Sequence, residues 1–208
     1  MGHGSGDSLL LQLKHLSIPR PSLLIGITSL QAHHARSLER TSNFLTQFPS
    51  STQVKLVQSD AIARGSDPDH PLSSSSDLPL FTSIVAIDCA FHFNTRALFL
   101  RQAFERLAPE GRIALADICF DKPSTLISLL AGVVAENMIS QEQYVCTLQE
   151  IGYEDIKLED ISYQVFPGFT RFLGKRGGTW RLVAMAMNFV STRGRYVMVS
   201  ARKPSSGK

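Results

Sequence analysis

The sequence is poor in the features that mark disulfide-rich and metal-binding proteins. Only three of its 208 residues are cysteines, Cys89, Cys119 and Cys146, and they lie far apart without any CxxC spacing. This pattern argues against a disulfide framework and against a zinc site. We therefore expect a reduced protein without a bound metal.

The chain also lacks a long apolar run. Its longest candidates are LISLLAGVVA and LVAMAMNFV, which fall short of the ~18–20 apolar residues that a membrane-spanning helix needs. The N-terminus has no basic segment followed by an apolar one, so no secretory signal is predicted. We expect a cytoplasmic protein, unless a targeting segment has been lost with a missing N-terminal part.

Acidic residues are absent from the last part of the chain. Residues 161–208 contain nine Lys/Arg and no Asp/Glu, whereas residues 1–160 contain twelve Lys/Arg and eighteen Asp/Glu. A basic end of this kind favours contact with an anionic partner. Because the rest of the chain is acidic, nucleic acid is not the expected partner.

Along the first 120 residues, the sequence alternates between strand and helix patterns. Short apolar runs between turn residues predict strands, and large apolar residues at helical spacing predict helices. The predicted strands are 22–28, 53–60, 81–87, which runs into a loop at 88–93, and 112–120, and the predicted helices are 8–16, 32–48 and 94–107. This alternation is typical of an α/β fold with a Rossmann-like, doubly wound, mostly parallel sheet in a single domain, 1–208.

The apolar spacing also predicts which helix faces are buried. In helix 32–48 we expect the inward residues to be Leu38, Phe44, Leu45 and Phe48. Helix 94–107 is expected to have Asn94 as its N-cap, with an inward face of Leu98, Ala103, Phe104 and Leu107.

After Asp121 the pattern changes. A helical pattern at 126–138 precedes a second one at 140–153, where Ser140 and Gln143 resemble a capping box and Gly152 a C-terminal stop. Strands are predicted at 156–166 and 195–203, the last one antiparallel. Two insertions are expected, a polar surface insertion at 66–79 and an aromatic, basic insertion at 163–194.

The segment GHGSGD places glycine at positions 2, 4 and 6, directly before a helical pattern. Glycine lets the backbone approach a ligand closely, and a helix N-terminus attracts anionic groups. The GxGxxG dinucleotide fingerprint would need a third glycine where Asp7 stands, which disfavours a nicotinamide-dependent oxidoreductase. On these residues alone, a flexible N-terminal tail is an equally good interpretation.

Five segments taken in order make the pattern specific. GHGSGD, GITSLQAHHAR, QSDA, AIDCAFHF and LAPEGRIALADI resemble the successive motifs of class I S-adenosylmethionine-dependent methyltransferases. GITSLQAHHAR is similar to the second-strand pattern of the small-molecule branch that includes the tocopherol methyltransferases. The resemblance covers roughly residues 2–160 and rests on the order and spacing of the motifs.

The resemblance implies where the cofactor S-adenosylmethionine would bind. Gly2, Gly4 and Gly6 would pass under its methionine portion. Thr28 and Ser29 would lie near the ribose, where the family commonly places an acidic residue. Hydroxyl side chains can hydrogen-bond there as well, although the carboxylate is missing.

The resemblance also implies roles for residues after two further strands. Asp60 and Ala61 correspond to the loop on the adenine side, and Asp88, Cys89 and His92 to the loop close to the sulfonium methyl group. His92 is the candidate general base, and a structural histidine is an equally good interpretation. Asp60 and Asp88 can also be turn residues at strand ends, and Cys89 is better explained as a small core residue than as a nucleophile.

The insertion at 163–194 occupies the usual place of a substrate-capping segment in this fold. Its basic and aromatic residues would suit an apolar or amphipathic acceptor, or a transient contact with a membrane surface. The predicted function is therefore S-adenosylmethionine-dependent methyl transfer to a small molecule.

One expected element is missing. The family places an apolar strand in the middle of the sheet immediately before the glycines, and here only Met1 precedes them. Each buried backbone group left without a partner costs ~1–3 kcal/mol. We therefore expect a truncated chain, and the alternative function is a catalytically inactive, methyltransferase-like binding module.

Overall fold

The computed structural model describes residues 1–15 and 17–205; Leu16, the end of the first predicted helix, lies outside them. The chain divides into two compact units, Met1–Pro79 and Leu80–Lys208. The expectation of a single domain over 1–208 stays a prediction.

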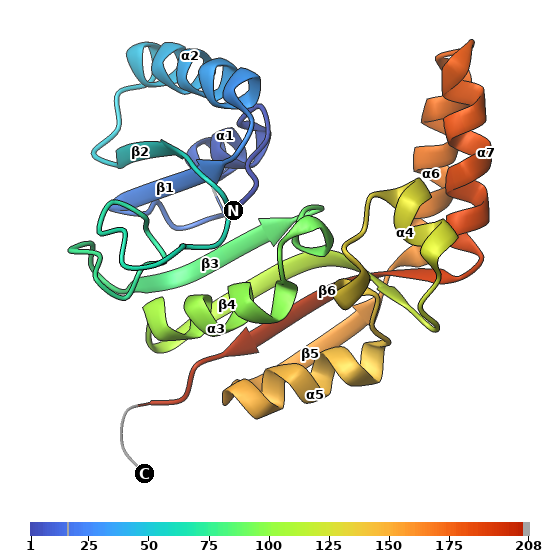
Figure 1. Cartoon of the computed structure of the whole chain (residues 1–208). Coiled ribbons are helices and arrows are strands. Elements are labelled where there is room, and N and C mark those ends of the chain that lie inside the picture. Colours follow the sequence, from blue (N-terminus) through green and yellow to red (C-terminus); the bar gives the residue numbers. More distant parts are fainter. Residues whose placement is uncertain (16, 206–208) are drawn as a thin grey trace. The chain divides into compact units, whose positions relative to one another are not determined.

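Unit 1 is a pair of parallel strands with two helices (Figure 1). Strands β1 (Leu23–Thr28) and β2 (Gln53–Gln58) pair from Leu23 opposite Gln53 to Thr28 opposite Gln58. The helices are α1 (Asp7–Lys14) and α2 (Gln31–Gln47). Buried leucines of α1 and β1 form the core with partly buried residues of α2 and β2, which are Phe44, Leu45, Val54 and Leu56. The predicted elements of this part are confirmed.

The predicted inward face of α2 is partly wrong. Leu38 and Phe48 are 42% and 59% exposed, whereas Ser37 and Thr41 are buried. The reason is close packing, since the Cβ position of Gly6 lies only 3.1 Å from the Ser37 Cβ atom. A leucine at position 37 would not fit against that loop.

Residues 59–79 contain no helix or strand, and the surface insertion expected at 66–79 stays a prediction. The loop nevertheless buries His70 and Leu72, each 2% exposed. His70 Nε2 lies 3.0 Å from the Asp60 carbonyl oxygen, and the Leu72 N–H donates to His70 Nδ1 at 3.1 Å. The imidazole thus ties this loop to the end of β2.

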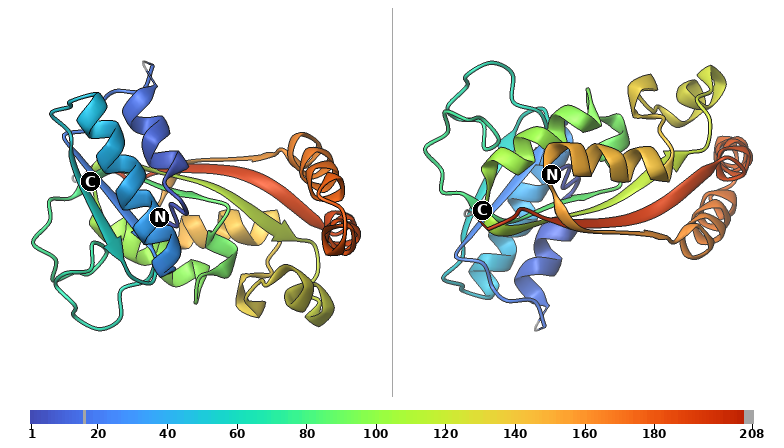
Figure 2. Two further views of the ribbon diagram at one scale, coloured as in Figure 1. Left: turned by 90° about the horizontal axis from the view of Figure 1, so that it is seen from above. Right: turned by 90° about the horizontal axis from the view of Figure 1, so that it is seen from below.

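Unit 2 is built on a mixed four-stranded sheet (Figures 1 and 2). Its strands are β3 (Phe81–Ile87), β4 (Leu107–Phe120), β5 (Glu154–Asp160) and β6 (Gly194–Arg202), in the order β3-β4-β6-β5. β3 is parallel to β4, and β6 is antiparallel to both of its neighbours. The α/β fold and the antiparallel C-terminal strand are confirmed. Within the described residues β1 pairs with β2 alone and β3 with β4 alone, so the loss of a central strand stays a prediction.

Helices α3 (Arg96–Arg106) and α5 (Gln141–Ile151) cover one face of the unit 2 sheet (Figure 2). α3 is capped by Thr95, not by Asn94, because the Thr95 side chain accepts a hydrogen bond from the Leu98 N–H. Leu98 was expected inside and is 40% exposed, since α3 turns Phe99 and Leu100 inward instead. The capping box of α5 and its stop at Gly152 are confirmed.

The region after β4 is only partly as predicted. The helical pattern at 126–138 becomes a short helix α4 (Thr125–Ala131) and a 3-10 turn η2 (Ala135–Asn137). The strand predicted at 156–166 ends at Asp160, and a helical hairpin follows, α6 (Ser162–Lys175) and α7 (Thr179–Ser191). Aromatic and β-branched residues locally favour a strand, but Phe166 and Leu173, seven residues apart, are both buried, as on one face of a helix.

Candidate functional site

The glycine loop before α1 has a backbone that only glycine adopts easily. Gly2, Gly4 and Gly6 have φ angles of 60°, 52° and 90°, in the left-handed region that L side chains avoid. Apart from Gly4 itself and its two chain neighbours, none of the described residues places an atom within 4 Å of the Gly4 Cβ position. The loop therefore offers an open stretch of backbone at the N-terminus of α1, which is a suitable cradle for a ligand.

Four interactions hold this loop in place. The His3 N–H donates to the Ile27 carbonyl at the end of β1, at 3.3 Å, and the Gly6 N–H donates to the His3 carbonyl at 2.9 Å. Arg40 of α2 donates to the Ser5 carbonyl at 2.8 Å and forms an ion pair with Asp7 at 2.6 Å. The hydrogen bond from Arg40 lowers the pKa of Asp7. The loop is thus ordered, which argues against a flexible tail.

His3 is a buried part of the loop. It is 6% exposed, and burial lowers the pKa of its imidazole to about 4. Its Nδ1 atom lies 3.0 Å from the Gly4 carbonyl oxygen. A side chain on Gly26 would place its Cβ 2.7 Å from the His3 ring, so Gly26 makes room for the loop beside β1.

The carboxyl ends of β1 and β2 lie next to each other in unit 1. Thr28 is buried and Ser29 exposed, and the Ser59 N–H donates to the Thr28 carbonyl at 3.1 Å. Asp60 follows directly and pairs with Arg64 at 3.0 Å, while Ala61 is 7% exposed. Since His3 binds the end of β1, unit 1 brings together seven of the predicted residues, namely Gly2, Gly4, Gly6, Thr28, Ser29, Asp60 and Ala61.

The other three predicted residues follow β3 in unit 2. Asp88 has a φ of 55°, its N–H donates to the Ala116 carbonyl at 2.8 Å, and its carboxylate accepts a hydrogen bond from the Tyr196 hydroxyl at 3.3 Å. Burial raises the pKa of the Cys89 thiol to about 12. Cys89 is therefore protonated at neutral pH and unsuited to act as a nucleophile.

His92 ends the 3-10 turn η1 (Ala90–His92) and is exposed. Its Nδ1 atom lies 2.6 Å from the Gly132 carbonyl oxygen. Because a carbonyl oxygen only accepts, Nδ1 carries the proton in this contact, and Nε2 of the neutral ring is left with its lone pair. This is the tautomer that a general base requires.

Asn137 holds the backbone on both sides of His92. Its side-chain amide donates to the carbonyl oxygens of Phe91 and Phe93 at 3.0 and 2.7 Å, and its Oδ1 atom accepts from the Arg96 N–H at 2.8 Å. Asn137 is 1% exposed. All three bonds therefore lie in the interior, where they restrict the loop that carries His92.

A buried ion pair lies beneath this loop. Arg96 and Asp117 are 1% and 0% exposed, and the Arg96 Nε atom lies 2.8 Å from Asp117 Oδ2. The Tyr144 hydroxyl donates to the same carboxylate at 3.0 Å, and its ring stacks under the guanidinium at 4.7 Å. Burial opposes the charge of Arg96, but the Asp117 carboxylate raises its pKa above the usual value.

The base of the α6–α7 hairpin packs against the His92 loop. Phe166 of α6 and Val190 of α7 share a buried cluster with Phe91 and Tyr196. Beside this cluster an open groove of about 430 Å³ lies between the two helices, and its lining consists of Phe166, Pro167, Thr170, Arg171, Asn188 and Ser191. The insertion expected at 163–194 thus adjoins the predicted base within unit 2.

Sequence reasoning missed several residues that shape these loops, above all Arg40, Asn137, Arg96 and Asp117. Arg40 lies 33 residues from its partner Asp7, and Asn137 lies 44 residues from Phe93. A single sequence carries no sign of such pairings. Only the LADI segment, in which Asp117 interrupts an apolar strand, contained a signal, because a buried carboxylate needs a partner.

Comparison with known proteins gives the following relatives. No family model matches the sequence. Erythromycin 3''-O-methyltransferase of Saccharopolyspora erythraea is 30% identical over 42% of this chain and 34% of its own. The 27-O-demethylrifamycin SV methyltransferase of Amycolatopsis mediterranei is 31% identical over 60% of this chain and 53% of its own. The chain thus spans about a third and about half of the length of these two relatives.

Solved structures share the fold at low sequence identity. Geranyl diphosphate C-methyltransferase from Streptomyces coelicolor, solved with Mg²⁺, geranyl diphosphate and S-adenosylhomocysteine, has a TM-score of 0.72 at 13% identity, covering 97% of this chain and 70% of its own. The [4+2]-cyclase SpnF also has a TM-score of 0.72, at 17% identity, covering 99% of this chain and 73% of its own. The chain is thus similar in sequence to two small-molecule methyltransferases over part of its length, and it shares its fold with a solved methyltransferase that binds S-adenosylhomocysteine.

Proposed function

We propose that this protein binds S-adenosylmethionine and transfers its methyl group to a small, apolar or amphipathic acceptor. The glycine loop carries the proposal, because three left-handed glycines at alternate positions leave an open backbone surface above Gly4. The two curated relatives, both methyltransferases by name, support the same reaction.

The residues of unit 1 fit the chemical groups of this cofactor. The glycine loop would hold its methionine portion, and the exposed Ser29 hydroxyl is available to the ribose. Thr28 is buried and would contribute through its backbone. The adenine would lie beside Asp60 and Ala61, where a buried, apolar Ala61 suits one face of a base. The carboxylate that the family commonly places at the ribose is replaced here by hydroxyl groups.

The reaction needs little covalent help from the protein. When bound, the cofactor supplies an electrophilic methyl group. His92 would take the proton from the acceptor nucleophile through its Nε2 lone pair. Asp88 and Cys89, in the same loop, would lie beside the cofactor. Holding the acceptor in line contributes as much as ~7–11 kcal/mol to such reactions. The protonated Cys89 takes no part as a nucleophile.

The acceptor would lie against the base of the α6–α7 hairpin. Phe91, which precedes His92 in the chain, and Phe166, which lines the groove between the helices, belong to one buried cluster there. Thr170, Arg171 and Asn188 add polar groups to the groove. This mixture of polar and apolar groups suits an amphipathic small molecule. The composition of the hairpin also favours a membrane surface as a second partner.

The proposal is tested by calorimetric titration of the chain with S-adenosylhomocysteine, the demethylated product. Micromolar binding is expected. Gly6→Ala should weaken it, because φ is 90° and the new Cβ would lie 3.1 Å from Ser37. Gly168→Ala is the matched control, since no atom lies within 4 Å of its Cβ position. Absence of binding to the unchanged chain, or equal binding by both variants, would overturn the glycine-loop assignment.

A non-catalytic binding module is the second candidate. Thr28 and Ser29 stand where the family commonly places an acidic residue, and this departure favours it. The fold by itself does not specify methyl transfer, because a [4+2]-cyclase shares it. Acceptor screening with labelled S-adenosylmethionine separates the two. Product binding with no methyl transfer to any natural-product alcohol would support the binding module, and turnover would exclude it.

A further inference from the structure

The α6–α7 hairpin has a one-sided charge that the methyl-transfer proposal does not explain. Its two helices and their connection, residues 162–191, contain four basic residues and no acidic one. The basic residues lie towards the connecting end, at Arg171, Lys175, Arg176 and Arg181. Basic surface without acidic neighbours attracts anions over the Debye length.

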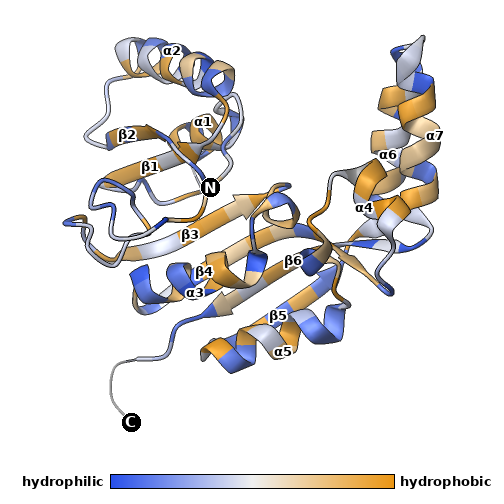
Figure 3. Cartoon of the chain, in the orientation of Figure 1, coloured by the Kyte–Doolittle hydropathy of each residue, from blue (hydrophilic) through white to orange (hydrophobic). Residues whose placement is uncertain are grey.

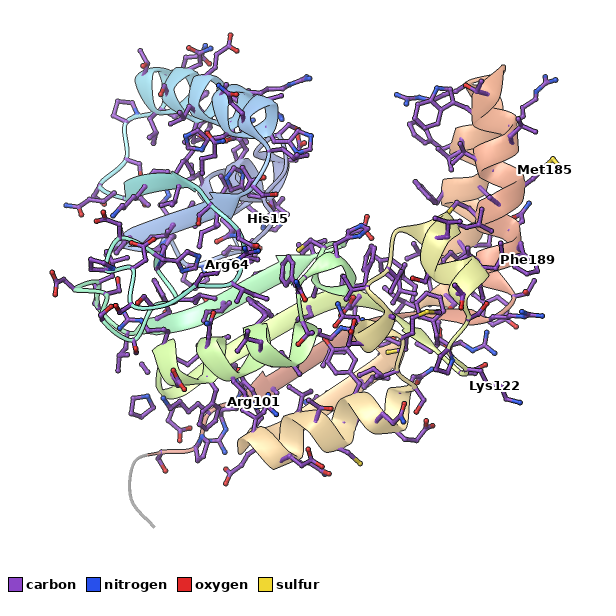
Figure 4. All side chains as sticks on the ribbon, viewed as in Figure 1. His15, Arg64, Arg101, Lys122, Met185 and Phe189 are labelled. Atoms are coloured by element: carbon purple, nitrogen blue, oxygen red, sulfur yellow. The ribbon has the colours of Figure 1, made fainter. Side chains whose placement is uncertain are left out.

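The same hairpin exposes large apolar side chains. Figure 3 shows hydrophobic residues along both helices, with hydrophilic residues at the connecting end. Met185 and Leu182 of α7 are both 67% exposed, Phe172 is 53% exposed and Trp180 42% exposed. Met185 projects outward from α7, as Figure 4 shows. Isolated apolar side chains on a surface are ordinary, but several large ones exposed on two neighbouring helices favour an interaction surface.

The exposure of these residues does not result from poor packing of the hairpin. The base of the hairpin is already anchored, because Phe166 and Val190 are buried in the cluster around Phe91. At the other end the Arg176 guanidinium lies 5.0 Å from the Phe172 ring centroid and 4.9 Å from that of Trp180. The hairpin therefore presents a basic, aromatic tip on a fixed base.

We propose that this tip and the exposed face of α7 dock onto an anionic membrane surface. Phe172, Trp180 and Leu182 would enter the interface between headgroups and acyl chains, and the basic residues would meet lipid phosphates. Tryptophan and tyrosine favour this depth because one end of each side chain is apolar and the other polar. None of the helices described combines the length and apolar character needed to cross a bilayer.

Charge decides between a membrane and a second copy of the chain. Two hairpins packed face to face would bring four basic residues from each copy together, with no acidic residue of either hairpin to pair with them. An anionic lipid surface supplies the opposite charge. The inference deepens the proposed function, because the same hairpin carries both the membrane-facing tip and the groove proposed for the acceptor, but it does not depend on cofactor binding.

The test uses Trp180, the only tryptophan of the chain, as a built-in reporter. Purified protein is mixed with vesicles of phosphatidylcholine containing phosphatidylserine, or of phosphatidylcholine alone, without cofactor or acceptor. A blue shift of Trp180 emission and co-sedimentation are expected with the phosphatidylserine vesicles only, and both should weaken at high salt.

Matched variants locate the contact. Lys175→Gln with Arg181→Gln should weaken partitioning about 30-fold, because each basic side chain at an anionic surface contributes roughly fivefold. The control, Lys122→Gln with Arg101→Gln, removes the same charge from exposed positions of unit 2 outside the hairpin (Figure 4) and should partition like the unchanged chain. Far-UV circular dichroism and the melting temperature verify that both variants fold.

Three results would overturn the proposal. The first is no binding to anionic vesicles by the folded protein. The second is an equal loss in the control variant, which would mean attraction by net charge alone. The third is a concentration-dependent Trp180 shift without vesicles, or a shift with a single-stranded oligonucleotide and not with vesicles, which would identify a second copy or a nucleic acid as the partner. Because no cofactor is present, none of these results depends on methyl transfer.

Discussion

Removing the Asp117 carboxylate should cost unit 2 a large part of its stability. The carboxylate is fully buried and accepts hydrogen bonds from Arg96, from the Tyr144 hydroxyl and from the Ile118 N–H. In Asp117→Ala the buried Arg96 guanidinium would keep its charge without a counterion. Breaking a buried pair in this way costs about 3–5 kcal/mol, against a total stability of ~5–15 kcal/mol for a typical domain.

Urea unfolding followed by Trp180 fluorescence measures this loss, because the only tryptophan lies in unit 2. With a dependence of about 1–3 kcal/mol per molar urea, the midpoint should fall by roughly 1–5 M. The matched control is Asp121→Ala, whose partner Arg195 lies 3.7 Å away at an exposed site. A surface pair of that kind contributes no more than about 1 kcal/mol.

A double replacement separates the charge from the packing. Arg96→Met with Asp117→Leu removes both charges and fills their space with apolar groups, so it should be less destabilising than Asp117→Ala alone. Two results would refute the reasoning. One is a loss of less than about 1 kcal/mol in Asp117→Ala, and the other is a double variant that is no more stable than the single one.

Three further predictions concern the loops of the candidate site. His92→Ala should lower turnover at least tenfold while S-adenosylhomocysteine affinity stays unchanged, with exposed His15→Ala as control; equal turnover would remove the assignment of the base. Burial lowers the pKa of His3 from 6.5 to about 4. Between these two values of pH, His3 takes up a proton in the unfolded state but not in the folded state, so protonation stabilises the unfolded state relative to the folded one. Unit 1 should therefore be most stable above pH 6.5 and lose stability towards pH 4; His3→Gln should flatten this dependence in circular dichroism melts, and a profile as steep as before would contradict it. Asn137→Ala should lower turnover more than product binding, because it releases the carbonyl oxygens on both sides of His92; restored turnover in Asn137→Asp would point instead to a role of the accepting oxygen alone.

Local patterns were sufficient for most elements of the fold. The apolar runs at 22–28 and 112–120 and the capping box at Ser140 predict elements that the structure contains, because turn and capping chemistry acts over a few residues. The same reasoning failed at residues 162–166. There the strand-forming Tyr163, Val165 and Phe166 lie in a helix, since burial of Phe166 together with Leu173 outweighs local preference.

Some features of the candidate site could likewise be predicted from the sequence, and others depend on tertiary packing. The sequence by itself predicted a loop of unusual backbone at Gly2, Gly4 and Gly6, and the structure has these residues in the left-handed region that glycine adopts most easily. The sequence also placed Asp60, Asp88 and His92 after strands, which decides that they lie at carboxyl ends. Only the tertiary structure decided that Ser37 rather than Leu38 faces the glycine loop, and that Asn137 fixes the backbone around His92. Those choices depend on partners 31 to 46 residues away along the chain, and side chains so distant in sequence are brought into contact by packing alone.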